Sequence, residues 1–405
     1  MEQSTFKVYG YRWLVLVAFM LAVAINQLLW ITFAPITGSA AAYYGVSDLS
    51  IGLLSMIFMI AYIIVSVPAS WVIDTYGFRV AVGIGAGLTG VFGLMRGLGA
   101  SSYTLVLIAQ VGIAIGQPFI LNAITKVAAR WFPLQERATA SGFGSLAMYV
   151  GILAGMVLTP FLSLRAGIAS MLLIYGVGAF IIGVIFIAIA RERPLSPPGP
   201  LEQEERTLML EGLKQVVLKK DFLWLMLIFF FGLGIFNSVT TWIEDIVRPR
   251  GFSITQAGIA GGLMIAGGVI GALILPALSD RYRRRVPFIM IALTGAIPGL
   301  AGVTFATSTA LLMLSAFVFG FFLLSSGPIG FQYGAEIARP TPEGTSTGLL
   351  LLMGQISGIA FILGMDSFKV PGTNSMTPSL IILIGLMLVS LWAATRLHES
   401  ELLAK

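Results

Sequence analysis

The side chains in this sequence that could do chemistry fall into two groups. Amides and tryptophans lie inside long apolar segments, whereas most carboxylates and arginines lie at the ends of those segments. A Trp ring attracts a desolvated cation by about 2 kcal/mol, and an amide oxygen can stabilise that cation without adding a competing charge. The first group therefore suits a neutral or permanently cationic solute. Its members are Asn26, Gln27, Trp30, Gln117, Asn122, Asn237, Trp242 and Gln355.

The composition excludes most other chemistry. Of the 405 residues, 57% are hydrophobic and only 10% are charged, so lipid must surround most of the protein. The chain has no cysteine and one histidine, His398, which excludes thiolate nucleophiles, Cys/His zinc sites and histidine acid–base chemistry. The net charge of +6 is spread over short turns and forms no basic face. We expect a membrane protein that is not an enzyme, without a cofactor, metal or nucleic-acid partner.

Twelve apolar stretches are long enough to cross a bilayer, which takes about 20 residues each. This predicts an all-α integral membrane protein of two six-helix halves, at 1–190 and 222–405, joined by a polar linker at 191–221. The expected spans are 12–36, 47–73, 79–99, 102–126, 137–163, 165–190, 222–247, 253–278, 286–307, 309–333, 344–368 and 376–397.

The distribution of basic residues predicts the orientation. With an even number of spans, both termini lie on the same side, and that side carries 19 of the Lys and Arg residues against 5 on the other. The positive-inside rule places the termini and the linker in the cytoplasm, in a plasma or bacterial inner membrane.

The two halves repeat a charged loop after their second span. Asp74 closes one copy and Asp280 the other, 206 residues further along. An acid at a helix end beside basic residues of the next helix can form a latch that holds one gate of a carrier shut. We predict a cytoplasmic gate here; the alternative is that these charges only set topology. The predicted gate residues are Asp74, Arg79, Asp280, Arg281 and Arg284. Two such six-span halves resemble the major facilitator superfamily.

No carboxylate is placed at the middle of a span, where a proton carrier would be expected. Asp245 and Asp366 fall near the outer ends of the seventh and eleventh spans, and Arg96 lies in the outer part of the third. Beside Asp245, Trp242 and Glu244 are interpreted as an interfacial anchor and a rim charge.

The predicted binding residues are Trp30, Gln117, Gln355, Asn26, Asn237 and Asn122. Gln117 and Gln355 come nearest the midplane, and we expect amides from both halves to face one solute. The alternatives are that Trp30 only packs and that the glutamines bridge helices.

Several strings resemble the feline leukaemia virus subgroup C receptor-related transporters, a family known for choline, ethanolamine and haem traffic. They are Arg12–Leu16, Asn26–Ile31, Tyr44–Ser47, Gly116–Leu121, Ala129–Phe132, Gly330–Glu336, Glu343–Leu350 and Gly354–Ile356. The resemblance implies that Trp30 stacks on choline and that Gln117 and Gln355 face the substrate. Asn237 stands where an aromatic wall of the family's site would align. The short termini and the lack of cysteine indicate a prokaryotic relative.

We expect an alternating-access transporter of a small polar or cationic metabolite, choline-like by resemblance, working as a monomeric uniporter. The alternative carrier is a proton- or ion-coupled transporter or exporter of an organic anion or other metabolite, with Arg96 serving the anion or Asp366 the proton. A third possibility is a receptor that senses a ligand through the linker without transporting it.

Overall fold

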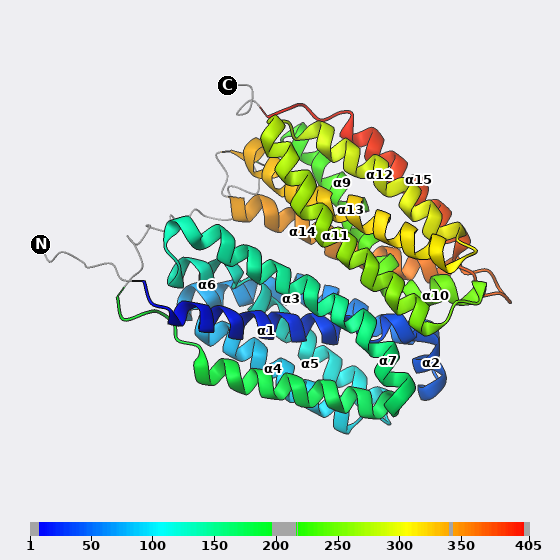
Figure 1. The fold of residues 1–405 in the computed structure, drawn as a ribbon, viewed down its shortest axis with the longest axis horizontal. Helices are drawn as coiled ribbons and strands as arrows, with labels where there is room; N and C mark the ends of the chain where they lie inside the picture. Colours follow the sequence, from blue (N-terminus) through cyan, green and yellow to red (C-terminus); the bar gives the residue numbers. More distant parts are fainter. Residues whose placement is uncertain (1–7, 197–215, 217, 340–342, 401–405) are drawn as a thin grey trace, which may run out of the picture. The chain divides into compact units, whose positions relative to one another are not determined.

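A computed structural model describes residues 8–196, 216, 218–339 and 343–400, and these are nearly all helical (Figure 1). The only β-structure found in these ranges is an isolated bridge between Val370 and Ser375. The predicted linker at 191–221 falls mostly on residues outside the described ranges. The chain divides into two compact units, one of residues 1–33 and 39–204 and the other of residues 34–38 and 205–405.

The first unit holds six spans. Its helices are α1 (Tyr11–Ile31), α2 (Thr37–Tyr44, which begins in the second unit), α3 (Asp48–Tyr76), α4 (Phe78–Leu98), α5 (Tyr103–Leu121), α6 (Ile124–Trp131) and α7 (Leu134–Ile189). One span is formed by α5 and α6 together, and α7 contributes two. The break in α7 is at Gly167, whose φ of 78° and ψ of 163° are not helical.

The second unit holds the other six spans. Its elements are η1 (Ala34–Ile36), α9 (Lys220–Thr241), α10 (Ile243–Val247), η2 (Arg248–Arg250), α11 (Ile254–Tyr282), α12 (Val286–Phe305), α13 (Thr309–Ala338), α14 (Glu343–Ser367) and α15 (Thr377–Ala394). The described residues contain eleven helices that are long and apolar enough to cross a membrane. Dividing α7 at Gly167 makes twelve, which confirms the predicted count of spans.

The helix pairings of the first unit recur in the second. In the first unit α3 packs on α5, α4 on α5 and α7, and α1 on α7. In the second unit α11 packs on α13, α12 on α13 and α15, and α9 on α14. Counted as spans within each half, these are the same pairs, 2–4, 3–4, 3–6 and 1–5. The repeat predicted from the Asp74 and Asp280 loops is therefore a repeat of packing as well as of sequence.

Glycines let the paired helices approach closely, as membrane helices require because lipid gives them no hydrophobic drive to associate. A Cβ on Gly151 of α7 would overlap the backbone of Ala24 in α1, and a Cβ on Gly176 would overlap that of Gly93 in α4. These contacts also place the two halves of α7 against different helices.

The short segment Ala34–Gly38 belongs to the second unit, although the residues on both sides of it belong to the first. The helix of the first span ends at Ile31, and Pro35 in η1 lacks the N–H that would continue it. The predicted N-terminal bundle over 1–190 was continuous and did not place residues 34–38 in the second unit.

The end of each unit that carries Asp74 or Asp280 is called its Asp end.

Candidate functional site

Trp30 is buried in the first unit and is held by α3. Its side chain is 7% exposed, and the indole Nε1–H donates a 3.2 Å hydrogen bond to the carbonyl oxygen of Ser55. The Ser55 hydroxyl donates in return to the Trp30 carbonyl at 3.5 Å. The indole N–H is therefore used within the unit, and any further polar contact of Trp30 must be made by its ring.

Asn26 is used to join helices. It is fully buried, and its amide nitrogen donates to the Thr89 hydroxyl of α4 at 3.1 Å and to the Ile113 carbonyl of α5 at 3.5 Å. An amide in hydrocarbon must find such partners. Asn26 thus ties α1 to α4 and α5 through its amide nitrogen, while its buried amide oxygen has no partner.

Asn122 is likewise engaged by its own unit. It lies at the junction of α5 and α6, where its amide oxygen accepts a 2.9 Å bond from the Tyr62 hydroxyl. Its amide nitrogen donates to the Ser66 and Ser70 hydroxyls of α3 at 3.0 and 3.1 Å. These bonds hold the α5–α6 junction against the part of α3 that contains Pro68. Both ends of the Asn122 amide are therefore used in packing the first unit.

The two glutamines predicted to face substrate are free of such bonds. Gln117 on α5 is buried at 6% exposure and Gln355 on α14 is half-buried. Within the described ranges, no hydrogen bond is found for either amide. Asn237 of α9 donates to the carbonyl oxygen of Gly354 at 3.1 Å, which places it beside Gln355 in the second unit.

At the Asp end of the first unit, Asp74 does not pair with the predicted Arg79. Its carboxylate contacts the Lys126 ammonium of α6 at 3.4 Å. The Arg79 side chain is exposed, and its backbone N–H donates to Glu192 at 2.8 Å, so that Glu192 caps the start of α4. A carboxylate near a helix N-terminus stabilises it.

At the Asp end of the second unit, Arg285 takes the place that we predicted for Arg281 and Arg284. The Arg285 guanidinium is buried and pairs with Asp280 and, at 3.1 Å, with Glu336. Burial alone would lower the pKa of Arg285, but the two carboxylates outweigh it and raise that pKa. Arg281 and Arg284 are exposed.

The helix cap of the first unit is repeated here. Glu399 accepts from the backbone N–H groups of Arg285 and Val286 at 3.0 and 2.9 Å, at the start of α12. Glu192 and Glu399 each follow the last span of a half and stand 207 residues apart, close to the 206-residue repeat. That spacing was a signal for the cap, and the sequence analysis missed it.

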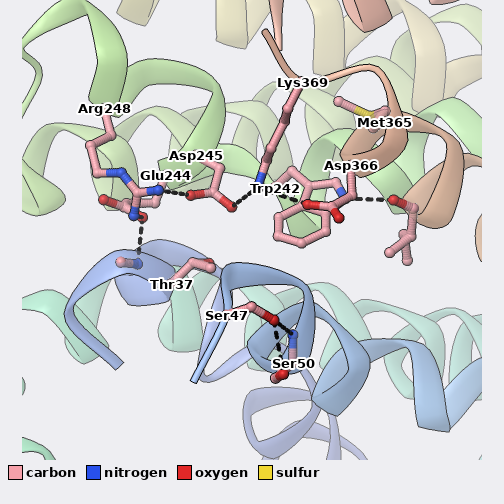
Figure 2. Close-up of polar contacts among 12 residues, drawn as sticks. Thr37, Ser47, Ser50, Trp242, Glu244, Asp245, Arg248, Met365, Asp366 and Lys369 are labelled. Atoms are coloured by element: carbon pink, nitrogen blue, oxygen red, sulfur yellow. Dashed lines mark hydrogen bonds and ion pairs between the residues drawn. The ribbon is translucent and has the colours of Figure 1, made fainter. Parts of the chain in front are cut away.

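The opposite end of the second unit holds a chain of ion pairs that sequence reasoning did not assemble (Figure 2). Arg248 contacts both Glu244 at 3.1 Å and Asp245 at 2.5 Å. Lys369 links Asp245 at 3.5 Å to Asp366 at 2.9 Å.

Trp242 forms one wall of this network. The Lys369 ammonium lies 4.7 Å from the centroid of the Trp242 ring. The Trp242 ring is fully buried and Glu244 is 3% exposed, so the interpretation of these two residues as an interfacial anchor and a rim charge is wrong. Trp242 instead donates to the Ile362 carbonyl of α14 at 3.1 Å, and Glu244 pairs with Arg248 and accepts from the Gly38 backbone.

Arg96 is fully buried and its contacts are all with its own unit. Its guanidinium donates to the Leu29 carbonyl at 3.0 Å, to the Gln110 side-chain oxygen at 2.8 Å and to the Thr32 hydroxyl at 3.4 Å. It also lies 5.7 Å from the ring of Phe33. Arg96 therefore caps the end of α1 and ties it to α5, which leaves it poorly placed to bind an anion.

The repeated six-span architecture and the apolar interior with few amides define a membrane carrier. Residues 19–362 match the family model described as Major Facilitator Superfamily. The chain belongs to this superfamily, and its members are transporters and not enzymes.

Individual relatives narrow the branch. The chain is 32% identical over 395 residues to "Solute carrier family 49 member A3" of Xenopus tropicalis, covering 92% of this chain and 81% of that one. It is 27% identical over 397 residues to "Choline/ethanolamine transporter FLVCR2" of Rattus norvegicus, covering 92% and 72%. The predicted resemblance to this branch is confirmed.

Solved structures share the fold. A bacterial homologue of the human lysosomal transporter Spinster, in an inward-facing and unoccupied conformation, aligns with a TM-score of 0.78 at 17% identity, covering 96% of this chain and 98% of that one. A D-xylose-proton symporter aligns with a TM-score of 0.74 at 17% identity, covering 97% and 99%. At such low identities, the likeness supports the fold alone.

Proposed function

We propose that this protein is a facilitative transporter of a small cationic amine of the choline or ethanolamine type. Relatives over more than nine-tenths of the chain are named as choline/ethanolamine transporters. The observation that carries the proposal is that Gln117 and Gln355 are amides within spans for which the described chain offers no hydrogen bond. A polar group in that state serves a wet path or a ligand, because hydrocarbon cannot satisfy it.

The proposed substrate contacts are the ring of Trp30 and the amide of Gln117 in the first unit, with Gln355 and Asn237 in the second. The ring would attract the ammonium group, and the amide oxygens would stabilise it further. Asn26 and Asn237 each have a bonded amide nitrogen, and the buried oxygen of Asn26 has no partner, so Asn26 also stays among the proposed contacts. Asn122 is left out because both its amide oxygen and its amide nitrogen are bonded within the unit.

Uniport is favoured because the charged residues near the spans are already paired. Asp366, the candidate proton carrier, contacts Lys369, and Arg96, the candidate anion ligand, is surrounded by acceptors of its own unit. These contacts weaken the alternative of a proton- or ion-coupled transporter of an organic anion.

We further propose that the Asp ends face the cytoplasm and that their ion pairs act in gating. The supporting residues are Asp74 with Lys126, and Asp280 with Arg285 and Glu336. The positive-inside count of basic residues supports this orientation in a plasma or inner membrane, with both termini in the cytoplasm. We also propose that the protein works as a monomer.

A binding screen on the purified protein tests the substrate class. A ligand that binds only the folded state raises the thermal unfolding midpoint as its concentration exceeds Kd. We expect choline or ethanolamine to raise this midpoint in the wild type and not in Trp30→Ala. A shift produced by organic anions, with none from the amines, would overturn the proposal in favour of the alternative carrier.

A further inference from the structure

Gln27 is a buried amide that the fold does not use. It lies on α1, it is 2% exposed, and its side-chain nitrogen is fully shielded yet has no hydrogen-bond partner. Its side-chain oxygen also makes no hydrogen bond to any residue that the structure describes. Leaving a buried polar group unpaired costs about 1–3 kcal/mol, so such a group calls for a ligand or water to complete it.

A second glutamine in the same unit shows what a structural amide looks like here. Gln110 on α5 is also completely buried, but its oxygen accepts from Arg96 at 2.8 Å. Its nitrogen donates to the carbonyl oxygens of Leu54 and Leu29 at 3.1 and 3.4 Å. Burial is therefore similar for the two side chains, and only Gln27 is left without partners.

The position of Gln27 on the helix aligns it with Trp30. Residues three apart share a helix face, with Cβ atoms about 5–6 Å apart. Gln27 is three residues after Ala24, whose backbone meets Gly151 of α7, and three residues before Trp30, which is bonded to Ser55 of α3. Gln27 thus lies on the strip of α1 between its contacts with α7 and with α3.

We propose that Gln27 binds the transported solute directly and selects for a polar oxygen close to the cationic group. A solute whose ammonium lies on the ring of Trp30 would place a neighbouring hydroxyl one helical turn away, where the Gln27 nitrogen can donate to it. The inference rests on the proposed amine substrate. It adds a specificity residue and the chemical class of the group that this residue reads, which is a hydroxyl or similar acceptor a few bonds from the nitrogen.

The first test needs no ligand. Gln27→Met keeps the length of the side chain and removes the unpaired amide, whereas Gln110→Met removes an amide that makes bonds. We expect the unfolding midpoint of ligand-free Gln27→Met in detergent to equal or exceed that of the wild type, and that of Gln110→Met to fall. If the two variants lose stability equally, Gln27 is a structural residue and the proposal is overturned.

The second test compares choline with ethyltrimethylammonium, which has the same cation and no hydroxyl. We expect the wild type to bind choline about five- to tenfold more tightly than the analogue, the size of one net hydrogen bond. In Gln27→Met this preference should disappear through weaker choline binding, with the affinity for the analogue unchanged.

The outcomes separate the two proposals. If the wild type binds choline and Gln27→Met keeps the full preference for it, the Gln27 assignment fails while the amine substrate stands. If the wild type binds neither amine, the amine substrate fails, and with it the specificity assigned to Gln27. The ligand-free comparison with Gln110→Met still shows whether the Gln27 amide contributes to the stability of the fold.

Discussion

The backbone N–H of Gly38, in the first span, donates a 2.8 Å hydrogen bond to the Glu244 carboxylate at the start of α10. Glu244 is in turn paired with Arg248, whose guanidinium occupies the space where a side chain on residue 38 would lie. The segment Ala34–Gly38 is thereby built into the second unit. The chain therefore passes from one unit to the other at Phe33 and back at Ser39, shortly after Trp30.

Gly38→Ala tests this docking. The added Cβ would overlap Arg248 and disturb its pairs with Glu244 and Asp245, so we expect a loss of about 1–3 kcal/mol in the free energy of unfolding. The matched control is Gly364→Ala on α14, where a Cβ meets nothing within 4 Å. Thermal unfolding in detergent checks both, and equal midpoints for the two variants would contradict the docking.

Arg285→Met tests the charge cluster at the Asp end of the second unit. The change leaves Glu336, whose side chain is 7% exposed, without its guanidinium partner, and should cost about 3–5 kcal/mol of stability. Arg284→Met, one residue away on the surface, should change stability by no more than about 0.5 kcal/mol. Denaturation of the two variants side by side measures the difference, and a larger loss for Arg284→Met would show that the predicted partner was right after all.

Arg96→Met separates a structural arginine from an anion ligand. Its removal leaves the Gln110 oxygen without its donor, at about 1–3 kcal/mol for a buried group left unpaired, and takes one of two side-chain donors from the Leu29 carbonyl. We expect a lower unfolding midpoint with an unchanged ranking of amines and anions in the binding screen. A stable variant that had lost binding of an organic anion would instead assign Arg96 to a substrate site.

Replacing Trp30 separates its ring from its N–H. Trp30→Phe loses the bond to Ser55 but keeps an aromatic face, whereas Trp30→Ala loses both. Because the ring contributes about 2 kcal/mol to a desolvated cation, Trp30→Ala should weaken choline binding roughly 30-fold, and Trp30→Phe by much less. Titration of purified variants with choline gives the affinities. Equal losses in both variants would indicate that Trp30 acts only by bracing α3.

The helical fold could be predicted from the sequence because a lipid bilayer allows few other structures for long apolar segments. Every backbone polar group in a bilayer must be satisfied within its segment, so apolar stretches of sufficient length become helices, and the 206-residue spacing of Asp74 and Asp280 shows the repeat. The predicted bounds of helices are less accurate where individual side chains set the end of a helix. The end of α1 at Ile31 depends on Pro35 and on capping by Arg96, and neither changes the apolar character of the stretch.

The candidate site was less predictable because hydrogen-bond partners are not visible in a single sequence. Asn26, Asn122 and Gln27 are all amides within predicted spans, yet the first two are bonded across helices and the third is unpaired. The same limit applies to charges. Among the four arginines in the five residues after Asp280, only the geometry of the α11–α12 turn singles out Arg285, and Glu336 comes from another helix.

Uptake of radiolabelled choline into proteoliposomes, with and without a pH gradient at fixed membrane voltage, tests the central claim most directly. We predict saturable uptake that requires a much higher choline concentration in Trp30→Ala and that is the same with and without the pH gradient, because transport is facilitative. Uptake that collapses when the pH gradient is removed would contradict uniport. Choline binding without any uptake would contradict transport itself and identify a receptor.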